Sequence, residues 1–269
     1  MATLNITSPA QTANARSSTW EQNADFWAKI IRGNHDRYRL DLTDSAILDA
    51  IGPVAGLRIL DAGCGEGYLA RELSSRGASV LGVDSSTRQI EAANELIPPK
   101  SANLTFKIND VASLQARDAS FDLIVCNHLL NDLSDPTGPI HELSRVLAPG
   151  GRVVILMLHP CFYTDRQTRN SSQHQGLGLA YFQARRVDQR FNVDGIVSPA
   201  EVTSWHRPLE FYIQTLRDAN LWLTDLREPH PSDEQLRDNP WWQANFPRPL
   251  FLLLVAQKHD ALPQAGPAR

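Results

Sequence analysis

Short apolar runs and helical apolar spacings alternate along most of the chain. Between the runs, apolar residues recur three or four positions apart at 68–76, 85–96, 140–147 and 209–219. The runs themselves, rich in Ile, Leu and Val, lie at 59–62, 79–84, 104–111, 121–126, 152–158, 221–226 and 250–255. Short runs of this kind predict strands, and the helical spacings predict amphipathic helices. Their order predicts an α/β fold with a doubly wound, Rossmann-like seven-stranded sheet.

The chain outside this pattern falls into three parts. Residues 19–51 carry apolar side chains at helical spacings and predict N-terminal helices before the first strand. Residues 1–18 are polar without periodicity, and 259–269 are rich in Pro and Ala, so we expect a flexible arm and a flexible tail. A single domain is therefore expected over residues 19–258.

The segment after the first predicted strand carries the clearest chemistry. Asp61-Ala-Gly-Cys-Gly-Glu-Gly67 has glycine at every second position and leads directly into the helical spacing of 68–76. Glycine lets the backbone turn sharply and approach a ligand closely. A loop of this kind, at the carboxyl end of a strand, is where a doubly wound sheet binds a nucleotide-like ligand.

The spacing of the glycines separates two kinds of ligand. A dinucleotide site requires Gly-x-Gly-x-x-Gly, but the position that would hold its third glycine is Tyr68, and the third glycine here is Gly67. Asp61 also lies where a dinucleotide site receives a pyrophosphate, and a carboxylate there favours a positively charged ligand. The loop resembles the cofactor loop of class I S-adenosylmethionine-dependent methyltransferases of the small-molecule type. The elements that follow, up to residue 158, keep that family's order.

The resemblance implies a set of contacts to S-adenosylmethionine. In the family, the acid that ends the second strand binds the ribose hydroxyls, and residues after the third and fourth strands contact the adenine and the methionine end. The matching residues here, with those of the loop, are Asp61, Gly63, Gly65, Gly67, Asp84, Ser85, Asp110, Val111 and Asn127. Asp84 could instead cap the following helix, a role that is also open to Ser85 and Ser86.

Residues 159–205 form a connection that is too long for a plain loop. They begin at the carboxyl end of the fifth predicted strand, where this fold places its active site, and we expect them to form an inserted substrate lid. Within them, 181–197 is compatible with a hairpin, and 205–208 is expected to open the next helix. The candidate substrate contacts are Tyr38, Tyr163 and Trp205. For Tyr38, a packed aromatic is an equal alternative.

Methyl transfer from a sulfonium is an in-line displacement, so the protein mainly aligns the reactants in a dry pocket. A base is required only when the nucleophile is a hydroxyl or a protonated amine. Histidine titrates near neutral pH, and the candidate bases close to the predicted active site are His128, His159 and His206. Each could instead be a hydrogen-bonded wall residue. The sequence leaves an O, N or C nucleophile open.

Composition narrows the class of partner. The net charge of −4 gives no electrostatic footprint for nucleic acid. The sequence has no run of 18 apolar residues and no secretory start, so we expect a cytoplasmic protein without a membrane contact. Its three cysteines contain no Cys-x-x-Cys pair and imply neither a disulfide framework nor a metal site. A homo-oligomer is compatible with these features.

We therefore expect a methyltransferase acting on a small molecule, for example an intermediate of natural-product synthesis. One alternative is a methyltransferase acting on a protein or on RNA, although the chain has no basic extension. The other is a protein that binds S-adenosylmethionine without transferring its methyl group. The acceptor itself is not specified by the sequence.

Overall fold

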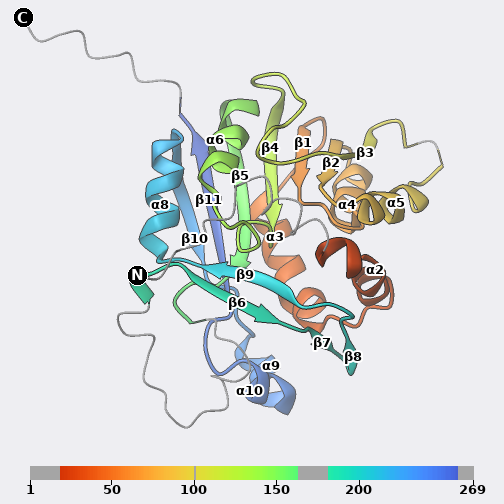
Figure 1. The fold of residues 1–269 in the computed structure, drawn as a ribbon, viewed down its shortest axis with the longest axis vertical. Helices are drawn as coiled ribbons and strands as arrows, with labels where there is room; N and C mark the ends of the chain where they lie inside the picture. The colour runs from red at the N-terminus through yellow and green to blue at the C-terminus, as the bar shows by residue number, and fades with distance from the viewer. Residues whose placement is uncertain (1–18, 100, 163–180, 260–269) are drawn as a thin grey trace, which may run out of the picture.

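The computed structural model describes residues 19–99, 101–162 and 181–259. At its centre lies a seven-stranded sheet in the order β10-β11-β5-β4-β1-β2-β3 (Figure 1). The strands are β1 (Arg58–Ala62), β2 (Ser79–Asp84), β3 (Leu104–Ile108), β4 (Phe121–Asn127), β5 (Leu147–Leu158), β10 (Leu221–Arg227) and β11 (Phe251–Lys258). Strand β11 pairs antiparallel with both β5 and β10, whereas the other pairs in the sheet are parallel. The expected Rossmann-like fold is confirmed.

Helices cover both faces of this sheet. On one face pack α3 (Asp44–Ile51), α4 (Tyr68–Ser75) and α5 (Thr87–Glu95), and on the other pack α6 (Thr137–Val146) and α8 (Leu209–Asp218). Strand β4 shows how one apolar run serves both. Leu123 and Val125 belong to the first core and Ile124 and Cys126 to the second, because successive side chains of a strand point to opposite faces. A parallel strand covered on both faces needs such an unbroken apolar run.

Two expected boundaries are wrong. Strand β5 begins at Leu147 rather than at 152, because Leu147 still pairs with Phe121 of β4 before the register between the two strands shifts. Residues 205–206 do not open a helix but end strand β9 (Val202–His206), and α8 starts only after Pro208. The backbone N–H of Trp205 donates to the carbonyl of Asn131 at 2.6 Å, which ties this strand to the loop after β4.

The expected hairpin over 181–197 exists only at its far end. There, β7 (Asn192–Val193) pairs with β8 (Ile196–Val197), whereas β6 (Arg185–Gln189) pairs antiparallel with β9, which lies beyond the expected hairpin. The result is a twisted two-stranded ribbon that carries a small hairpin at its tip. Figure 1 shows this ribbon crossing the lower end of the molecule, on the side where β4 and β5 end.

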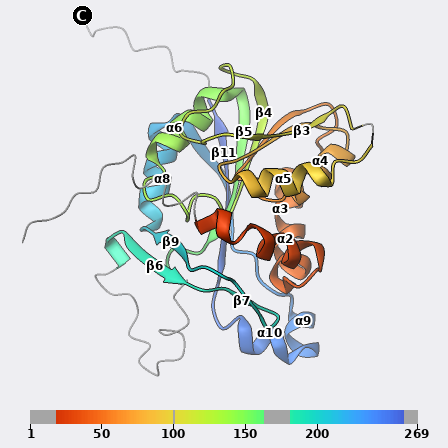
Figure 2. The same cartoon turned by 45° about the vertical axis from the view of Figure 1, so that its right-hand side comes forward.

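The helix α2 (Ala24–Arg32) lies on the same side as the ribbon (Figure 2). Here the side-chain amide of Asn23 exchanges two hydrogen bonds with the backbone of Ala200, at 3.2 and 3.1 Å. Nδ1 of His35 contacts Oδ2 of Asp194 at 2.9 Å. Residues 19–38 and 185–206 thus form one cover, called the roof below. The helices α9 (Asp233–Asp238) and α10 (Pro240–Asn245) lie at the same end of the molecule.

Several expectations fall on residues that the structure does not describe. These are the arm over 1–18, all but the first residue of the tail over 259–269, and the candidate substrate contact Tyr163. Of the helices that the structure does describe, none combines the length and the apolar character that crossing a membrane requires.

Candidate active site

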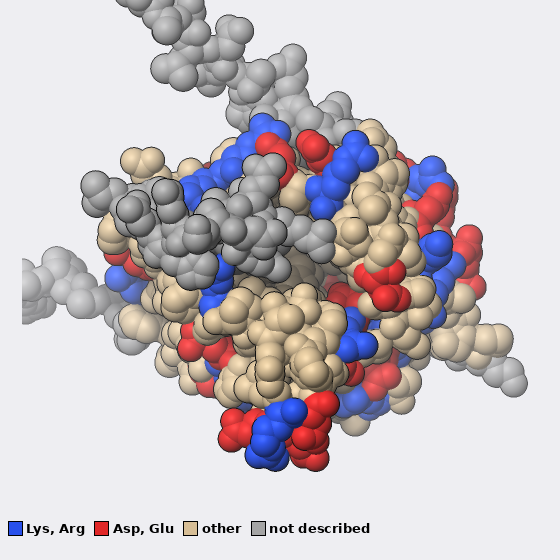
Figure 3. Space-filling view, turned by 90° about the horizontal axis from the view of Figure 1, so that it is seen from below, with Lys and Arg blue, Asp and Glu red and all other residues tan. Residues whose placement is uncertain are grey.

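A cavity of about 1290 Å³ opens at the carboxyl ends of β1, β2 and β4, under the roof. Single-ligand pockets commonly measure about 300–1,000 Å³, so this cavity has room for two ligands side by side. Its lining includes carboxylates from four strand ends or the loops after them: Asp61, Asp84, Asp110 and Asp132. Figure 3 looks onto this end of the molecule, where acidic and basic side chains are interspersed.

The glycine loop between β1 and α4 has left-handed backbone at all three of its glycines, with φ of 72°, 55° and 81° at Gly63, Gly65 and Gly67. A side chain on Gly65 would meet nothing closer than Oε1 of Gln89, 4.0 Å away, so this residue exposes bare backbone to the cavity. Gly67 is different, because a Cβ there would lie 2.4 Å from Cζ of Phe106. Gly67 does not line the cavity but lets α4 begin against the core.

Replacing Gly67 by Ala is expected to lower the free energy of unfolding by roughly 1–3 kcal/mol more than replacing Gly56, because only the first change overpacks the core. Gly56 has the same left-handed φ, 80°, but nothing lies within 4 Å of its added Cβ. Urea unfolding of the two variants would separate backbone strain from the collision with Phe106. Equal losses would mean that the phenylalanine ring moves aside freely.

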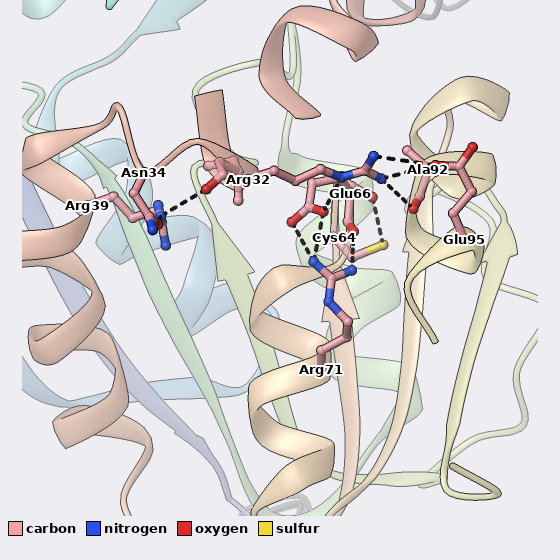
Figure 4. Close-up of polar contacts among 10 residues, drawn as sticks. Arg32, Asn34, Arg39, Cys64, Glu66, Arg71, Ala92 and Glu95 are labelled. Carbon is pink, nitrogen blue, oxygen red and sulfur yellow. Dashed lines mark hydrogen bonds and ion pairs between the residues drawn. The ribbon is translucent and has the colours of Figure 1, made fainter. Parts of the chain in front are cut away.

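Glu66, between the second and third glycines, fixes the loop to its surroundings. Both of its carboxylate oxygens accept from Nη2 of Arg71 at 2.8 Å, and Nε of Arg32 lies 3.7 Å from Oε2 (Figure 4). Arg32 in turn donates to the carbonyl of Ala92 and to Glu95 in α5. The Glu66 side chain is only 2% exposed, so its charge is held by two guanidinium groups in place of water.

Asp61, the last but one residue of β1, stands at the base of the cavity with no partner for either carboxylate oxygen among the described residues. It is 1% exposed. Burial, and then the nearby charge of Asp84, raise the pKa of Asp61 to about 7. A buried carboxylate without a partner is unfavourable, and a positively charged ligand in the cavity would relieve this.

Asp84 ends β2 and holds the loop from the other side. Its Oδ2 accepts from the backbone N–H of Gly65 at 3.0 Å, and its Oδ1 accepts from that of Ser86 at 2.9 Å. The cap of α5 is Ser86, whose hydroxyl accepts from the N–H of Gln89. Asp84 is therefore not the helix cap, and it lines the cavity next to Ser85.

The residues expected to face the adenine also reach the cavity. Asp110 and Val111 follow β3, and both line it. Val111 is buried, whereas Asp110 is exposed and accepts from the N–H of Ala112 at 2.9 Å. This pair offers an apolar surface and an acceptor at the same place.

Asn127, the last residue of β4, lines the cavity with an amide that is half satisfied. Its Nδ2 donates to the hydroxyl of Tyr68 at 2.8 Å. Its buried Oδ1 accepts from no donor in the described part of the chain. Among the described residues, neither Asn127 Oδ1 nor the carboxylate of Asp61 thus has a donor, and both of these buried residues border one cavity.

Comparisons with known proteins agree with this geometry. The family described as "Methyltransferase domain" matches residues 60–155, from β1 to β5. A ubiquinone biosynthesis O-methyltransferase of Alkalilimnicola ehrlichii is 26% identical over 172 residues, 64% of this chain and 67% of that protein. Residues 60–155 therefore form the methyltransferase domain of a class I S-adenosylmethionine-dependent enzyme.

Solved structures show the same fold. An S-adenosylmethionine-dependent methyltransferase from Mesorhizobium loti is 25% identical and superposes with a TM-score of 0.60, covering 79% of this chain and 94% of its own. One from Listeria monocytogenes, 22% identical, superposes with a TM-score of 0.66 over 80% of this chain and 95% of its own. S-adenosylmethionine is the cofactor of this methyltransferase. The residues present fit this cofactor. The acceptors of Asp61 and Asn127, which have no donors among the described residues, suit its positive charges. The bare backbone at Gly65 lets a ligand approach closely.

Two of the three candidate histidines do not line the cavity of the methyltransferase. Nε2 of His159 contacts Oε1 of Glu228 at 2.8 Å, and its Nδ1 accepts from the N–H of Cys161 at 3.2 Å. His206 is buried in β9 with Nε2 3.1 Å from the hydroxyl of Ser204, and burial lowers its pKa to about 4. The ring of His159 thus joins the end of β5 to the residue after β10, whereas the ring of His206 bonds within its own strand.

His128 does line the cavity, one residue after β4. Its backbone has a φ of 61°, in a region that non-glycine residues rarely adopt, and its N–H donates to the carbonyl of Leu156 at 2.8 Å. The ring stands edge-on to Phe251 with 5.8 Å between centroids. Burial lowers the pKa of His128 to about 4, so the ring is neutral at pH 7 and a weak base.

The structure separates the two described candidates for substrate contact. Tyr38 lines the cavity as a packed aromatic, with its ring 5.0 Å from that of Trp241 and its hydroxyl donating to the carbonyl of Asn245 at 2.8 Å. Trp205 does not line the cavity. Strand alternation puts Val202 and Ser204 on the cavity side, and Trp205 therefore points the other way.

Asp132 was not a candidate from the sequence, yet it lies in the cavity five residues after Asn127. Within the described chain, its carboxylate accepts no hydrogen bond and forms no ion pair. Burial, followed by the charge of Asp84, raises its pKa well above the usual range. An acid shortly after the fourth strand was the available signal, but a loop acid is also ordinary turn chemistry.

Proposed function

We propose that this methyltransferase transfers the methyl group of S-adenosylmethionine to a hydroxyl oxygen of a small aromatic molecule. The observation that carries the proposal is the carboxylate of Asp132, which has no partner among the described residues and borders a cavity walled by aromatic rings. The relative from Alkalilimnicola ehrlichii is named as an O-methyltransferase, which supports an oxygen nucleophile.

The cofactor would occupy the half of the cavity at the strand ends. Asp84 has lone pairs left to accept from the ribose hydroxyls, and Asp110 with Val111 would face the adenine. Asp61 and Asn127 would lie towards the positively charged methionine end, since both have buried acceptors free. Bound S-adenosylmethionine supplies a methyl group on a positively charged sulfur, which an oxygen nucleophile displaces in line. Ser85 would contribute a hydroxyl at the edge of the ribose site.

The acceptor would lie between two aromatic walls. Tyr38 and Trp241 form one of them. Trp27 of α2 and Phe191 of the ribbon, 5.1 Å apart between centroids, form the other. Flat apolar walls of this kind suit a planar acceptor, because aromatic rings prefer stacked or edge-on neighbours at such distances.

Asp132 would act as the base. A hydroxyl must lose its proton as it accepts a methyl group, and the proton would pass to the Asp132 carboxylate. The raised pKa makes this carboxylate a stronger base than an exposed aspartate. His128, with its pKa lowered to about 4, would instead shape the wall beside Phe251.

The roof favours a small molecule over a protein or RNA. Its two segments are joined to each other above the cavity by the bonds of Asn23 and His35. The surface around them is mixed in charge and shows no basic face (Figure 3). RNA binding depends mainly on positive charge along the backbone contact, which this surface does not provide.

Tritium transfer from S-adenosyl-[methyl-³H]methionine to matched acceptor pools would test the proposal. One pool holds phenols and catechols, a second holds anilines with the same rings, and a third holds unfolded protein and total RNA. Label is expected in the hydroxyl pool, in a product stable to base as an ether is. Label only in the anilines or the macromolecules, or in none of the pools, would overturn it.

A further inference from the structure

The side chains of Arg39, Asp44, Tyr68 and Asn127 form a connected chain of polar contacts at the wall of the cavity. Tyr68 begins α4 directly after the glycine loop, and Asp44 begins α3. The Tyr68 hydroxyl donates to Oδ1 of Asp44 at 2.9 Å, and Asn127 Nδ2 donates to the same hydroxyl at 2.8 Å. Nη1 of Arg39 donates to Oδ2 of Asp44 at 2.8 Å.

The direction of these hydrogen bonds follows from the number of protons available. An ionised carboxylate only accepts, so the single proton of the Tyr68 hydroxyl is used on Asp44. The hydroxyl can then only accept from Asn127. Burial, and then the charge of Asp44, raise the pKa of Tyr68 well above its usual value, so the phenol keeps this proton.

Arg39 favours the ionised form of Asp44, which can only accept the hydrogen bond from Tyr68. Its guanidinium carries the positive charge beside Asp44, and it also lies over the face of the Tyr68 ring, 4.8 Å from the ring centroid. Burial raises the pKa of Asp44 above its usual value, and the guanidinium of Arg39 and the hydroxyl of Tyr68 oppose this rise, whereas the charge of Asp36 adds to it. The Asp44 side chain is only 23% exposed, so water reaches its contact with Arg39 only in part.

We propose that Tyr68 and Asp44 are positioning residues that fix the amide of Asn127, so that its carbonyl oxygen faces the cavity and receives the α-ammonium group of the cofactor. With the amide reversed, its NH₂ group would face that ammonium and its oxygen would meet the Tyr68 hydroxyl. Tyr68 would then have to donate to two acceptors with one proton. The two groups thereby select one of two amide orientations of nearly equal shape.

This proposal rests on the cofactor contact proposed above for Asn127, and one experiment tests the two separately. The probes are S-adenosylhomocysteine and its analogue that lacks only the α-amino group, 4-(5′-deoxyadenosin-5′-ylthio)butanoic acid. Binding of both is measured by isothermal titration to the full chain. Their affinity ratio reports the ammonium contact and leaves ribose, adenine and carboxylate contacts constant.

Asn127→Ala is expected to weaken the binding of S-adenosylhomocysteine roughly 10- to 100-fold, as loss of a hydrogen bond to a charged group does. The affinity for the deaminated analogue should change little. Tyr68→Phe is expected to weaken the binding of S-adenosylhomocysteine about 5- to 20-fold, because the amide of Asn127 is then free to turn. The affinity for the deaminated analogue should again change little. The double variant should be no weaker than Asn127→Ala alone, since Tyr68 acts through Asn127. Tyr212→Phe, a buried tyrosine of α8 outside the cavity, is the control and should change neither ligand.

If Asn127→Ala leaves the ratio of the two affinities unchanged, the cofactor contact of Asn127 is wrong and the positioning role falls with it. If Asn127→Ala is selective and Tyr68→Phe weakens both ligands equally, only the positioning role is overturned, because Tyr68 then supports the loop as a whole. Additive losses in the double variant would overturn it as well. Thermal unfolding of each variant shows whether it is folded at the titration temperature.

Discussion

Asp132→Asn is expected to lower kcat by roughly 10²- to 10⁴-fold on a hydroxyl acceptor, since an amide cannot accept the proton that a base removes. Its affinity for S-adenosylhomocysteine should stay as in the unchanged protein, because Asp132 is not among the proposed cofactor contacts. Turnover is measured with the best acceptor from the tritium assay.

The pH profile separates a base from a residue that only shapes the pocket. The base works when ionised, and its pKa is raised, so kcat/KM should fall as pH drops below that raised pKa and should be flat above it. In Asp132→Asn the residual rate should lose this dependence. Asp135→Asn, the same change three residues further along the loop, is the matched control. If Asp132→Asn itself keeps the rate and the pH profile of the unchanged protein, Asp132 is not part of the mechanism.

Asp61→Asn is expected to stabilise the cofactor-free protein at pH 8 while weakening cofactor binding. The folded pKa of Asp61, about 7, lies above its ordinary value of 3.8. The folded state therefore binds more protons between these two values, and Asp61 lowers stability progressively as pH rises from about 4 through about 7. Integrated from pH 5 to pH 8, the difference amounts to about 3 kcal/mol.

Urea unfolding of both proteins at pH 5 and pH 8 measures this effect. The gap in unfolding free energy, variant minus unchanged protein, should be larger by about 3 kcal/mol at pH 8. Other carboxyl groups cancel in this comparison because both proteins contain them. If the difference in unfolding free energy between Asp61→Asn and the unchanged protein is the same at pH 5 and pH 8, the Asp61 carboxylate does not lose a proton between these pH values in the folded protein.

The cofactor half of the molecule could be predicted because its signals are local. The strand, the glycine loop and the helix from 59 to 76 are adjacent in sequence, and each limits the conformation of the next. The same holds for the acid that ends β2. All the expected cofactor residues line the cavity except Gly67, which packs against Phe106. That exception depends on a residue 39 positions away and could not be read locally.

The acceptor half depends on contacts between distant segments. His159 bonds to the distant Glu228, and neither His159 nor His206 lines the cavity. Trp205 faces away because β9 pairs with β6, and the register of that pair decides which alternate residues point inward. Histidine chemistry near neutral pH suggested bases at these positions, whereas the structure shows a raised pKa at Asp132, where burial disfavours the charged carboxylate.

The roof has a consequence for how acceptor preference can change. Its two segments come from before β1 and after β5, and the part of the chain that matches the methyltransferase family, 60–155, contains neither of them. They meet above the cavity through side chains and one backbone contact at Ala200, without adding a strand to the central sheet. On the acceptor site proposed above, substitutions in the roof would alter the acceptor while the strands and the glycine loop keep the methyl donor. In evolutionary terms, that proposal makes donor and acceptor recognition two modules of this chain that can diverge at different rates.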